Sequence, residues 1–299
     1  MELPTPIKNL YRHWRLHTTE HLTSFSEKIP KELCRFINDR MKIWEKKTAG
    51  LPAPYTDDPV LSKYRFCNVL RELDRQTIEF HTLLNPIRND FSLWLLNMFY
   101  CRMVARPETI VAAGLLSYNA IENNLVYRKL MAHPRPRFGT PYVFPVSTIM
   151  KSGTPTRELF ITRHLPLVML KIADEIQTWE KKSVYDGVNT LLPIFGYNHS
   201  FLWTEVLIDV AYQFPQHIDL FKQFPIGPGS LPTIKKLCGA KNPSIFASEL
   251  ANIGITLELT YKNRPVRLSA ENWEGIGCEY RKYSNLKQGK GRKRLYRPI

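Results

Sequence analysis

The sequence predicts a mainly α-helical protein, and three observations support this fold class. Apolar residues recur at helical spacing, or strong helix formers predominate, over most of the 299 residues. Prolines separate many of these segments, as expected where helices end. Only one stretch, near the C-terminus, alternates apolar and polar residues as a strand does. With 43% apolar residues the chain can bury a large core, and we expect a single compact helical domain.

The expected elements follow one another along the chain in a simple order. Eight helices are expected, at His13–Phe25, Ile29–Lys47, Val60–Leu84, Phe91–Met103, Pro107–Leu116, Tyr118–Met131, Leu165–Lys181 and Phe201–Phe214. A proline-rich linker precedes the third helix, and four prolines predict a long irregular segment over residues 133–157, a length often associated with function. Ile255–Tyr261 alternates and Pro265–Leu268 returns after a turn, which predicts a small β-hairpin near the C-terminus.

Three parts are expected from this pattern. Residues 1–55 form an N-terminal helical segment that packs on the body, and residues 56–283 form the catalytic helical domain. Residues 284–299 form a basic tail. The stretch Arg281–Ile299 holds eight basic residues and no acid, and it has too few apolar residues to contribute much core.

The charge balance indicates a polyanionic partner. Lys and Arg number 42 against 27 for Asp and Glu, so the net charge is +15, and solubility alone does not require so large an excess. Nucleic acid is the partner that this balance favours. The alternative is a basic protein with no polyanionic partner.

Other features exclude some classes of protein. The N-terminus lacks the pattern of a signal peptide, and no apolar run approaches the ~18 residues that span a membrane, so no membrane association is expected. The five cysteines are odd in number, scattered and without a CxxC pair, which indicates reduced thiols in a cytoplasmic protein and no zinc ribbon. His13, His17 and His21 share a helical stripe, and two such histidines can bind a metal ion. No glutamate follows in HExxH form and no further ligand is indicated, so no metal site is expected.

The stretch from Thr56 to Arg75 contains the densest group of polar side chains. On a helix over Val60–Leu84, one arc is apolar and the opposite face is polar. The polar face carries Arg65, Asn68, Glu72, Arg75 and Glu79, with Arg71 and Asp74 on the flank. Such a helix would hold a rigid polar site. The alternative is a solvated face with ion pairs such as Arg71–Asp74.

Three carboxylates are candidates for catalysis. Asp74 lies at the edge of the apolar arc, where a half-buried carboxylate beside arginines would stay ionised. It could stabilise a developing oxocarbenium at a sugar C1′ or position a water there. Asp209 is an acid in an apolar helix, and its alternative is a cap or a buried ion pair. Asp58 precedes a proline, and its alternative is a helix N-cap.

A glycine turn opens a short basic helix in the C-terminal third. Gly227 and Gly229 would permit close approach of the backbone, and amides at a helix start can bind phosphate. Lys235 and Lys236 would add charge. The GxxxxGK[ST] spacing of a phosphate-binding loop is absent. The stretch Leu192–Asn198 is only weakly similar to the hairpin of helix-hairpin-helix DNA binders, because it lacks their second glycine.

Several of these motifs together resemble a helical DNA-base hypermodification family. Arg65-Phe-Cys-Asn-Val-Leu-Arg-Glu-Leu-Asp-Arg is similar to its RF-x-N-V-x-R-x-x-D-R motif. The similarity continues in order through Trp94–Arg106, Phe195–Asp209, the glycine turn and Trp273–Tyr283, which carries Glu279 and Lys282 in a C-E-x-x-K-Y pattern. That family includes the helical domain of hydroxymethyldeoxyuridine DNA kinases and the alpha-glutamyl/putrescinyl-thymine pyrophosphorylases, which are amino acid:DNA transferases.

The resemblance implies a fold related to helical DNA glycosylases and action on a hypermodified pyrimidine in DNA. No kinase phosphate-binding loop is present, so the kinase reaction is not expected. His199 and Trp203 stand where the family is expected to have small residues.

The favoured interpretation is a DNA glycosylase that flips a modified pyrimidine, such as glycosylated hydroxymethylcytosine of phage DNA, and leaves an abasic site. No cofactor is expected. The alternative is a transferase that replaces pyrophosphate on a hydroxymethylpyrimidine with an amine or amino acid, and a third possibility is a non-catalytic DNA-binding module. The residues expected to contact substrate or DNA are Arg65, Asn68, Arg71, Arg75, Gly227, Gly229, Lys235, Lys236, Glu279, Lys282, Lys287, Lys290, Arg292, Lys293 and Arg294.

Overall fold

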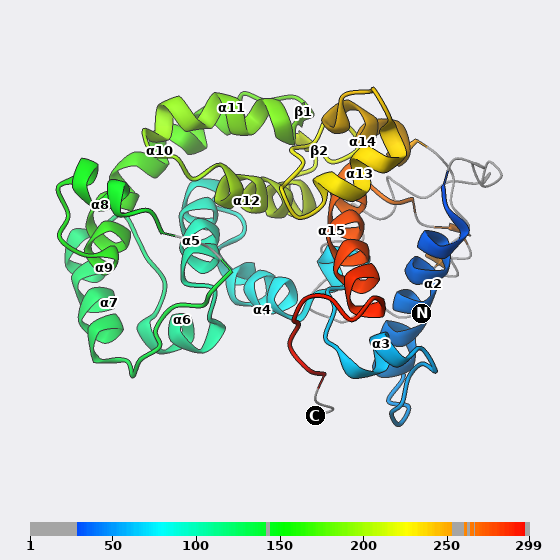
Figure 1. The fold of residues 1–299 in the computed structure, drawn as a ribbon. Helices are drawn as coiled ribbons and strands as arrows, with labels where there is room; N and C mark the ends of the chain where they lie inside the picture. The colour runs from blue at the N-terminus through cyan, green and yellow to red at the C-terminus, as the bar shows by residue number, and fades with distance from the viewer. Residues whose placement is uncertain (1–28, 142–143, 253–259, 262–263, 266, 297–299) are drawn as a thin grey trace. The chain divides into compact units, whose positions relative to one another are not determined.

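The computed structural model confirms a mainly α-helical fold (Figure 1). It describes residues 29–141, 144–252, 260–261, 264–265 and 267–296. The chain divides into two compact units. Unit 1 combines the residues up to Asp74 with those from Leu220 onward, and unit 2 is the continuous segment Arg75–Asp219. This division differs from the expected three parts, because both boundaries between units fall inside residues 56–283.

Unit 1 is built around one long C-terminal helix. Its elements are α2 (Lys31–Thr48), α3 (Pro59–Lys63), the 3-10 turn η2 (Arg71–Leu73), α13 (Leu231–Cys238), α14 (Pro243–Ala251), β3 (Thr260–Tyr261), β4 (Arg264–Pro265) and α15 (Ala270–Lys287). Helix α15 begins with a capping box between Ser269 and Asn272. It packs against α2, α3, α13 and α14, and its Trp273 is buried in the core.

The predicted hairpin is confirmed where the structure describes it. Strands β3 and β4 are antiparallel, with Thr260 opposite Pro265 and Tyr261 opposite Arg264. The rest of the predicted hairpin, except for Arg267 and Leu268, lies outside the described residues.

Unit 2 packs its helices around α5. Its elements are α4 (Arg75–Leu84), η3 (Asn85–Ile87), α5 (Phe91–Val104), α6 (Pro107–Ala113), α7 (Ala120–Ala132), α8 (Val146–Ser152), α9 (Arg157–Leu159), the π-helical turn η4 (Phe160–His164), α10 (Leu165–Gln177), β1 (Lys182–Ser183), α11 (Val184–Phe195), α12 (Ser200–Gln213) and β2 (Ile218–Asp219). Asp90 caps α5, and nearly every side chain of this helix from Trp94 to Val104 is buried between α10 and α12. Strands β1 and β2 form a short parallel pair.

The prediction of one helix over Val60–Leu84 is wrong. Helix α3 ends at Lys63, residues 65–70 form neither helix nor strand, and the next α-helix, α4, starts at Arg75. The polar face expected to unite Arg65, Asn68 and Arg75 therefore does not form. Helix α8 also lies inside the segment expected to be irregular, and α11, α14 and α15 were not among the predicted helices. The short basic helix expected after the glycine turn is present as α13.

Two further expectations concern the N-terminal helix and membrane-spanning segments. The predicted helix His13–Phe25, with its three histidines, lies outside the described residues. Among the helices that the structure describes, none has the length and apolar character needed to cross a membrane.

Candidate functional site

Residues between Tyr64 and Asp74 form a loop in place of the expected helix. Side chains bind the backbone groups of this loop. Arg40 of α2 is buried, and its guanidinium donates to the carbonyl oxygens of Phe66 and Cys67 at 3.0 Å. The Asn68 amide donates to the carbonyl of Leu73 at 2.8 Å. These contacts satisfy the backbone groups that a helix would have paired internally, so the chain turns back on itself here.

Asp74 closes this loop. Its Oδ1 accepts a hydrogen bond from the backbone N–H of Asn68 at 2.9 Å. Burial raises the pKa of Asp74, although that hydrogen bond and the nearby charges of Arg71 and Arg40 act in the opposite direction. Glu279 adds a further upward contribution to the pKa. Asp74 is therefore a half-buried carboxyl group whose pKa lies above that of an ordinary aspartate.

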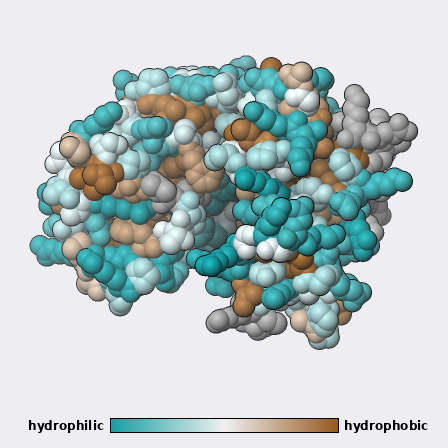
Figure 2. Space-filling view, viewed as in Figure 1, coloured by the Kyte–Doolittle hydropathy of each residue, from teal (hydrophilic) through white to brown (hydrophobic). Residues whose placement is uncertain are grey.

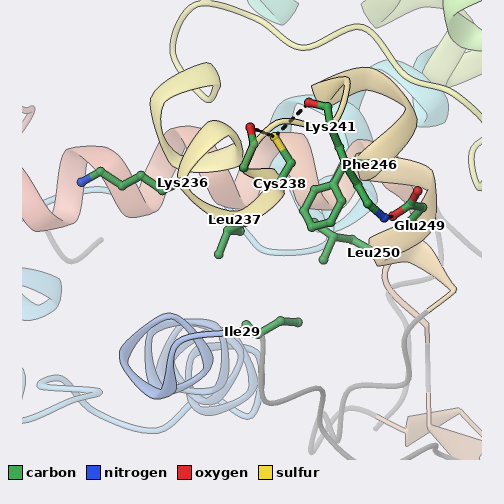
Figure 3. A pocket seen from close by; sticks show the side chains of 9 residues that line it. Ile29, Lys236, Leu237, Cys238, Lys241, Phe246, Glu249 and Leu250 are labelled. Carbon is green, nitrogen blue, oxygen red and sulfur yellow. Dashed lines mark hydrogen bonds and ion pairs between the residues drawn. The ribbon is translucent and has the colours of Figure 1, made fainter.

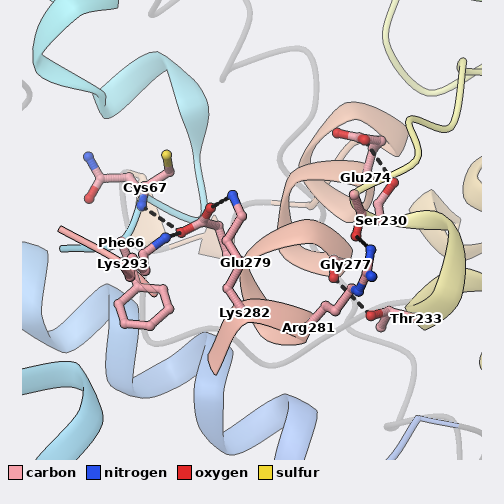
Figure 4. Close-up of polar contacts among 12 residues, drawn as sticks. Phe66, Cys67, Ser230, Thr233, Glu274, Gly277, Glu279, Arg281, Lys282 and Lys293 are labelled. Carbon is pink, nitrogen blue, oxygen red and sulfur yellow. Dashed lines mark hydrogen bonds and ion pairs between the residues drawn. The ribbon is translucent and has the colours of Figure 1, made fainter. Parts of the chain in front are cut away.

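Glu279 of α15 contacts the same loop (Figure 4). Its carboxylate accepts from Lys282 Nζ at 2.6 Å, from Lys293 Nζ at 2.7 Å and from the backbone N–H of Cys67 at 3.1 Å. Burial by itself would raise the pKa of Glu279, but the two lysines outweigh it and hold the pKa below its ordinary value. Glu279 therefore remains a fixed negative charge that anchors the loop.

Glu274 precedes Glu279 on α15 and binds the glycine turn (Figure 4). Its Oε1 accepts from Ser230 Oγ at 2.7 Å and from the backbone N–H of Gly227 at 3.3 Å. Burial raises the pKa of Glu274, with Ser230, the Gly227 amide and Arg71 opposing the shift. Arg71 thus acts electrostatically on both Asp74 and Glu274.

The glycine turn has a packing role that the phosphate-binding prediction did not include. A Cβ on Gly229 would lie 2.7 Å from Cys278 Sγ, and one on Gly227 would lie 3.1 Å from Glu274 Oε1. Both glycines therefore permit the close approach of α15. The Gly227 amide, expected to bind phosphate, is already bonded to a carboxylate of the protein itself.

We call Arg71, Asp74, Glu274, Glu279, Lys282 and Lys293 the polar cluster. It combines two carboxyl groups of raised pKa with a carboxylate of lowered pKa and three cations, all within unit 1. Such a combination can bind an anionic group through its cations and transfer protons through its carboxyl groups. Among the described residues, no group of three or more His, Cys, Asp or Glu side chains is arranged to hold a metal ion.

Comparisons with known proteins match most of the chain. Residues 27–293 match the family described as the helical domain of 5-hmdU DNA kinase. The chain belongs to this family. A curated relative, the 5-hmdU DNA kinase of Bacillus phage SP10, is 28% identical over 286 residues, which is 84% of this chain. No solved structure matches.

The match to this helical-domain family includes the sequence motifs that meet in unit 1. The chain spans 44% of the length of the phage relative, so it corresponds to part of that protein. Within the matched region, the motif from Arg65 to Arg75 and the segment Trp273–Tyr283 supply Arg71, Asp74, Glu274, Glu279 and Lys282 of the polar cluster, and the glycine turn contacts Glu274. The resemblance identified from the sequence is thereby confirmed.

Asp209 lies in unit 2 and is fully buried in an ion pair. Arg102 donates to both of its oxygens at 2.6 Å, and His81 Nε2 lies 3.0 Å from Oδ1. Burial alone would raise the pKa of Asp209, but Arg102 and His81 outweigh it and lower the pKa. The geometry is that of the alternative interpretation, a buried ion pair, and it gives no support to catalysis by Asp209.

Asp58 has the geometry of a helix N-cap, which was the alternative to a catalytic role. Its Oδ1 accepts from the backbone N–H groups of Val60 and Leu61 at 2.9 Å, so it caps α3 ahead of Pro59. Its second oxygen accepts from the Tyr283 hydroxyl at 2.6 Å, which ties α3 to α15.

Arg65 and Arg75 do not share a surface on one helix. Arg65 is exposed, and its backbone N–H donates to the carbonyl of Arg294 at 2.9 Å. Arg75 belongs to unit 2, where its exposed side chain pairs with Glu79 at 2.7 Å. Their predicted contacts with DNA stay predictions.

Lys235 and Lys236 are exposed on α13. Lys236 also lines a cavity of about 350 Å³ between α13, α14 and Ile29 (Figure 3). The walls are largely apolar, and Lys241 at the edge pairs with Glu249 at 2.6 Å. This cavity is separate from the residues of the polar cluster.

The predicted basic tail is partly built into the fold. Lys287 is the last residue of α15, and the exposed Lys290, Arg292 and Arg294 follow it. An isolated β-bridge joins Leu295 to Tyr64, and Lys293 lies 4.3 Å from the centroid of the Phe66 ring. Lys293 is held in the fold by its ion pair with Glu279, and its side chain is only 14% exposed.

Two functional candidates were missed from the sequence. Glu274 was hidden because no helix was predicted over Ala270–Lys287, although the Ser269-x-x-Asn272 start and the Glu274–Glu279 spacing were available. Arg40 was missed because a basic residue on an amphipathic helix normally faces solvent. Only its buried position, opposite the loop at Phe66, reveals its role.

Proposed function

We propose that this protein modifies the 5-substituent of a hydroxymethylpyrimidine in DNA by a transfer reaction. Support comes from its membership of the helical-domain family and from a relative named for a kinase of 5-hmdU in DNA. The net charge of +15 suits a DNA substrate. The single observation that carries the proposal is the polar cluster, in which lysine and arginine side chains lie near carboxyl groups whose pKa is raised by burial.

The proposed reaction starts from a pyrimidine whose 5-hydroxymethyl oxygen carries a diphosphate. An amine nitrogen forms a bond to the methylene carbon while the carbon–oxygen bond breaks, and diphosphate leaves with the bonding electrons. The amine loses one proton, which a carboxylate accepts. No oxidant or reductant is required.

Asp74 and Glu274 are the proposed proton acceptors. Burial raises the pKa of both, which brings these groups nearer to the working range of a general base. Arg71 acts on both, and in this role it keeps enough of the ionised form to bind a protonated amine. Since the Gly227 amide and Ser230 already fix Glu274, Asp74 has the greater freedom to act on substrate.

Lys282 is the proposed ligand of the leaving phosphate groups. Lys282 is half exposed, with 48% of its side chain accessible, and so can reach a phosphate while still close to Glu279. Exposed cations beyond α15, such as Lys290 and Arg292, would contact the DNA backbone without reading its sequence.

Base excision remains a second candidate, because a half-buried carboxyl group such as Asp74 also suits attack at a sugar C1′. The family comparison favours modification over excision, since the phage relative is named for adding a group to the base. A non-catalytic DNA-binding module is the third candidate, and the raised pKa values within the polar cluster favour an enzyme over it.

Mass spectrometry of nucleosides and released bases tests the proposal. The protein is incubated with DNA that contains 5-hydroxymethyluracil or its diphosphorylated form, with and without a mixture of amines and amino acids. A mass-shifted nucleoside that requires the amine supports transfer. A free modified base supports excision, and unchanged DNA under all conditions contradicts both enzymatic proposals.

A further inference from the structure

A pair of half-buried aromatic side chains lies on unit 2, away from any residue used above. His164 ends the π-helical turn η4, and Tyr197 follows Gly196 in the turn between α11 and α12. The Tyr197 hydroxyl and His164 Nε2 are 2.7 Å apart, and the two rings meet edge to face at a centroid distance of 5.4 Å.

Buried rings support this pair from below. Phe160 is fully buried and stacks on His164, with an interplanar angle of 28°. Phe195 is also buried and meets Tyr197 edge to face at 5.3 Å. The inner sides of both rings are thus fixed by the core, and their remaining accessible surface faces away from it.

The backbone at His164 is unusual in a way that requires an explanation. Residues 157–177 run as one helix in which five residues form a π turn, a less stable geometry that is frequently found at functional sites. The turn brings His164 over Phe160 and beside Tyr197.

The sequence neighbours of the pair include exposed apolar residues and one exposed cation. Hydrophobic side chains reach the surface of unit 2 in several places (Figure 2). Leu167, in the first turn of α10, is 76% exposed, and Phe201, in the first turn of α12, is 57% exposed. The exposed Arg163 precedes His164. No acidic residue lies between Phe160 and Val168 or between Gly196 and Thr204.

We propose that His164 and Tyr197 form a stacking site for an unpaired base of DNA. Aromatic faces bind bases by stacking regardless of sequence, and nearby cations attract the backbone. Burial lowers the pKa of His164, so a neutral ring that stacks well is present at physiological pH. This inference uses only the DNA partner of the proposed function and is independent of the chemistry in the polar cluster.

A fluorescent oligonucleotide tests the site in the full chain. Single-stranded DNA with one 2-aminopurine is titrated with the protein, because stacking on an aromatic ring quenches its emission. The double variant His164→Ala with Tyr197→Ala should weaken binding about tenfold or more and lose the quenching. Unchanged affinity and unchanged quenching in this variant would overturn the proposal.

Two further variants separate stacking from a structural role. His164→Phe with Tyr197→Phe removes the hydrogen bond but keeps both ring faces, so it should bind and quench as the wild type does. If it instead loses as much binding as the alanine variant, stacking is not the function of the pair. Tyr185→Ala removes another surface aromatic of unit 2, 38% exposed, and should change nothing.

The outcomes are distinguishable from those of the proposed function. Loss of stacking with intact modification of DNA supports the second site alone. Intact stacking with no modification contradicts the proposed reaction and leaves the stacking site in place.

Discussion

Each of the two units places an aspartate near an arginine, yet the pKa of one carboxyl group is lowered and that of the other is raised. In unit 2, Arg102 binds both oxygens of Asp209, and the pKa of the acid falls. In unit 1, Asp74 accepts a backbone hydrogen bond and feels the charge of Arg71, yet burial still raises its pKa. A carboxylate whose partners outweigh burial contributes to stability, whereas one whose partners do not is available for chemistry.

The largest effect is expected at Asp209. Asp209→Asn leaves Arg102 buried without its counter-ion, so the free energy of unfolding should fall by about 3–5 kcal/mol. Urea denaturation followed by circular dichroism measures it. The matched double variant, Asp209→Leu with Arg102→Met, removes both charges and should recover most of the loss. A stable Asp209→Asn protein that has lost activity would instead make Asp209 a catalytic residue.

Asp74→Asn should affect rate instead of stability. Its side-chain oxygen can still accept from the Asn68 amide, but it cannot take a proton, so the single-turnover rate should fall about 10²-fold or more. Since burial raises the pKa of Asp74, its ionisation at neutral pH disfavours folding, and the asparagine variant should be at least as stable as the wild type. A normal rate, or a large drop in melting temperature, would contradict this assignment. Glu274→Gln is the companion variant.

The stabilising contribution of Glu279 is expected to depend on pH. Its pKa is held below the ordinary value, so its stabilising contribution is present above about pH 4.5 and is lost as the pH falls through its folded pKa. At pH 7, Glu279→Gln should unfold with about 2 kcal/mol less free energy than the wild type. Melting temperatures from pH 3 to 7 should converge at the acidic end. Parallel curves would mean that Lys282 and Lys293 do not stabilise the ionised acid.

The smallest effect concerns the exposed cations after α15. Replacing Lys290 and Arg292 by Gln should reduce the slope of log K against log salt by about 0.9 for each phosphate that is no longer neutralised, on any duplex sequence. Binding isotherms at several salt concentrations measure the slope. The exchange Lys290→Arg with Arg292→Lys keeps the charge and should keep the slope. An unchanged slope in the glutamine variant would show that these two residues do not bind DNA.

Local signals predicted much of the fold, because apolar residues at helical spacing mark helices such as α2, α5 and α12. The helix Phe91–Met103 differs from α5 by one residue, as Asp90 and its apolar sequence suggest. The prediction of a helix over Val60–Leu84 was wrong because apolar periodicity reports only the local preference of the chain. Contacts from Arg40, far away in sequence, together with Asn68 and Asp74, stabilise a loop there instead.

The candidate site was predictable in its membership more than in its geometry. Asp74, Arg71, Glu279, Lys282 and Lys293 were all named from the sequence, and all belong to the polar cluster. The sequence could not show that Glu274 accepts a hydrogen bond from the backbone N–H of Gly227, because the two residues are 47 positions apart. The same limit applies to Asp209, whose partner Arg102 is 107 residues away.

The discontinuity of unit 1 has a consequence for synthesis of the protein. Unit 2 is one continuous segment, so it can fold as soon as it leaves the ribosome. The loop at Tyr64 and Arg65, in contrast, pairs with Arg294 and Leu295, and Glu279 requires Lys293. The polar cluster therefore forms last, because nascent chains that stop short of residue 293 lack the lysine that pairs with Glu279.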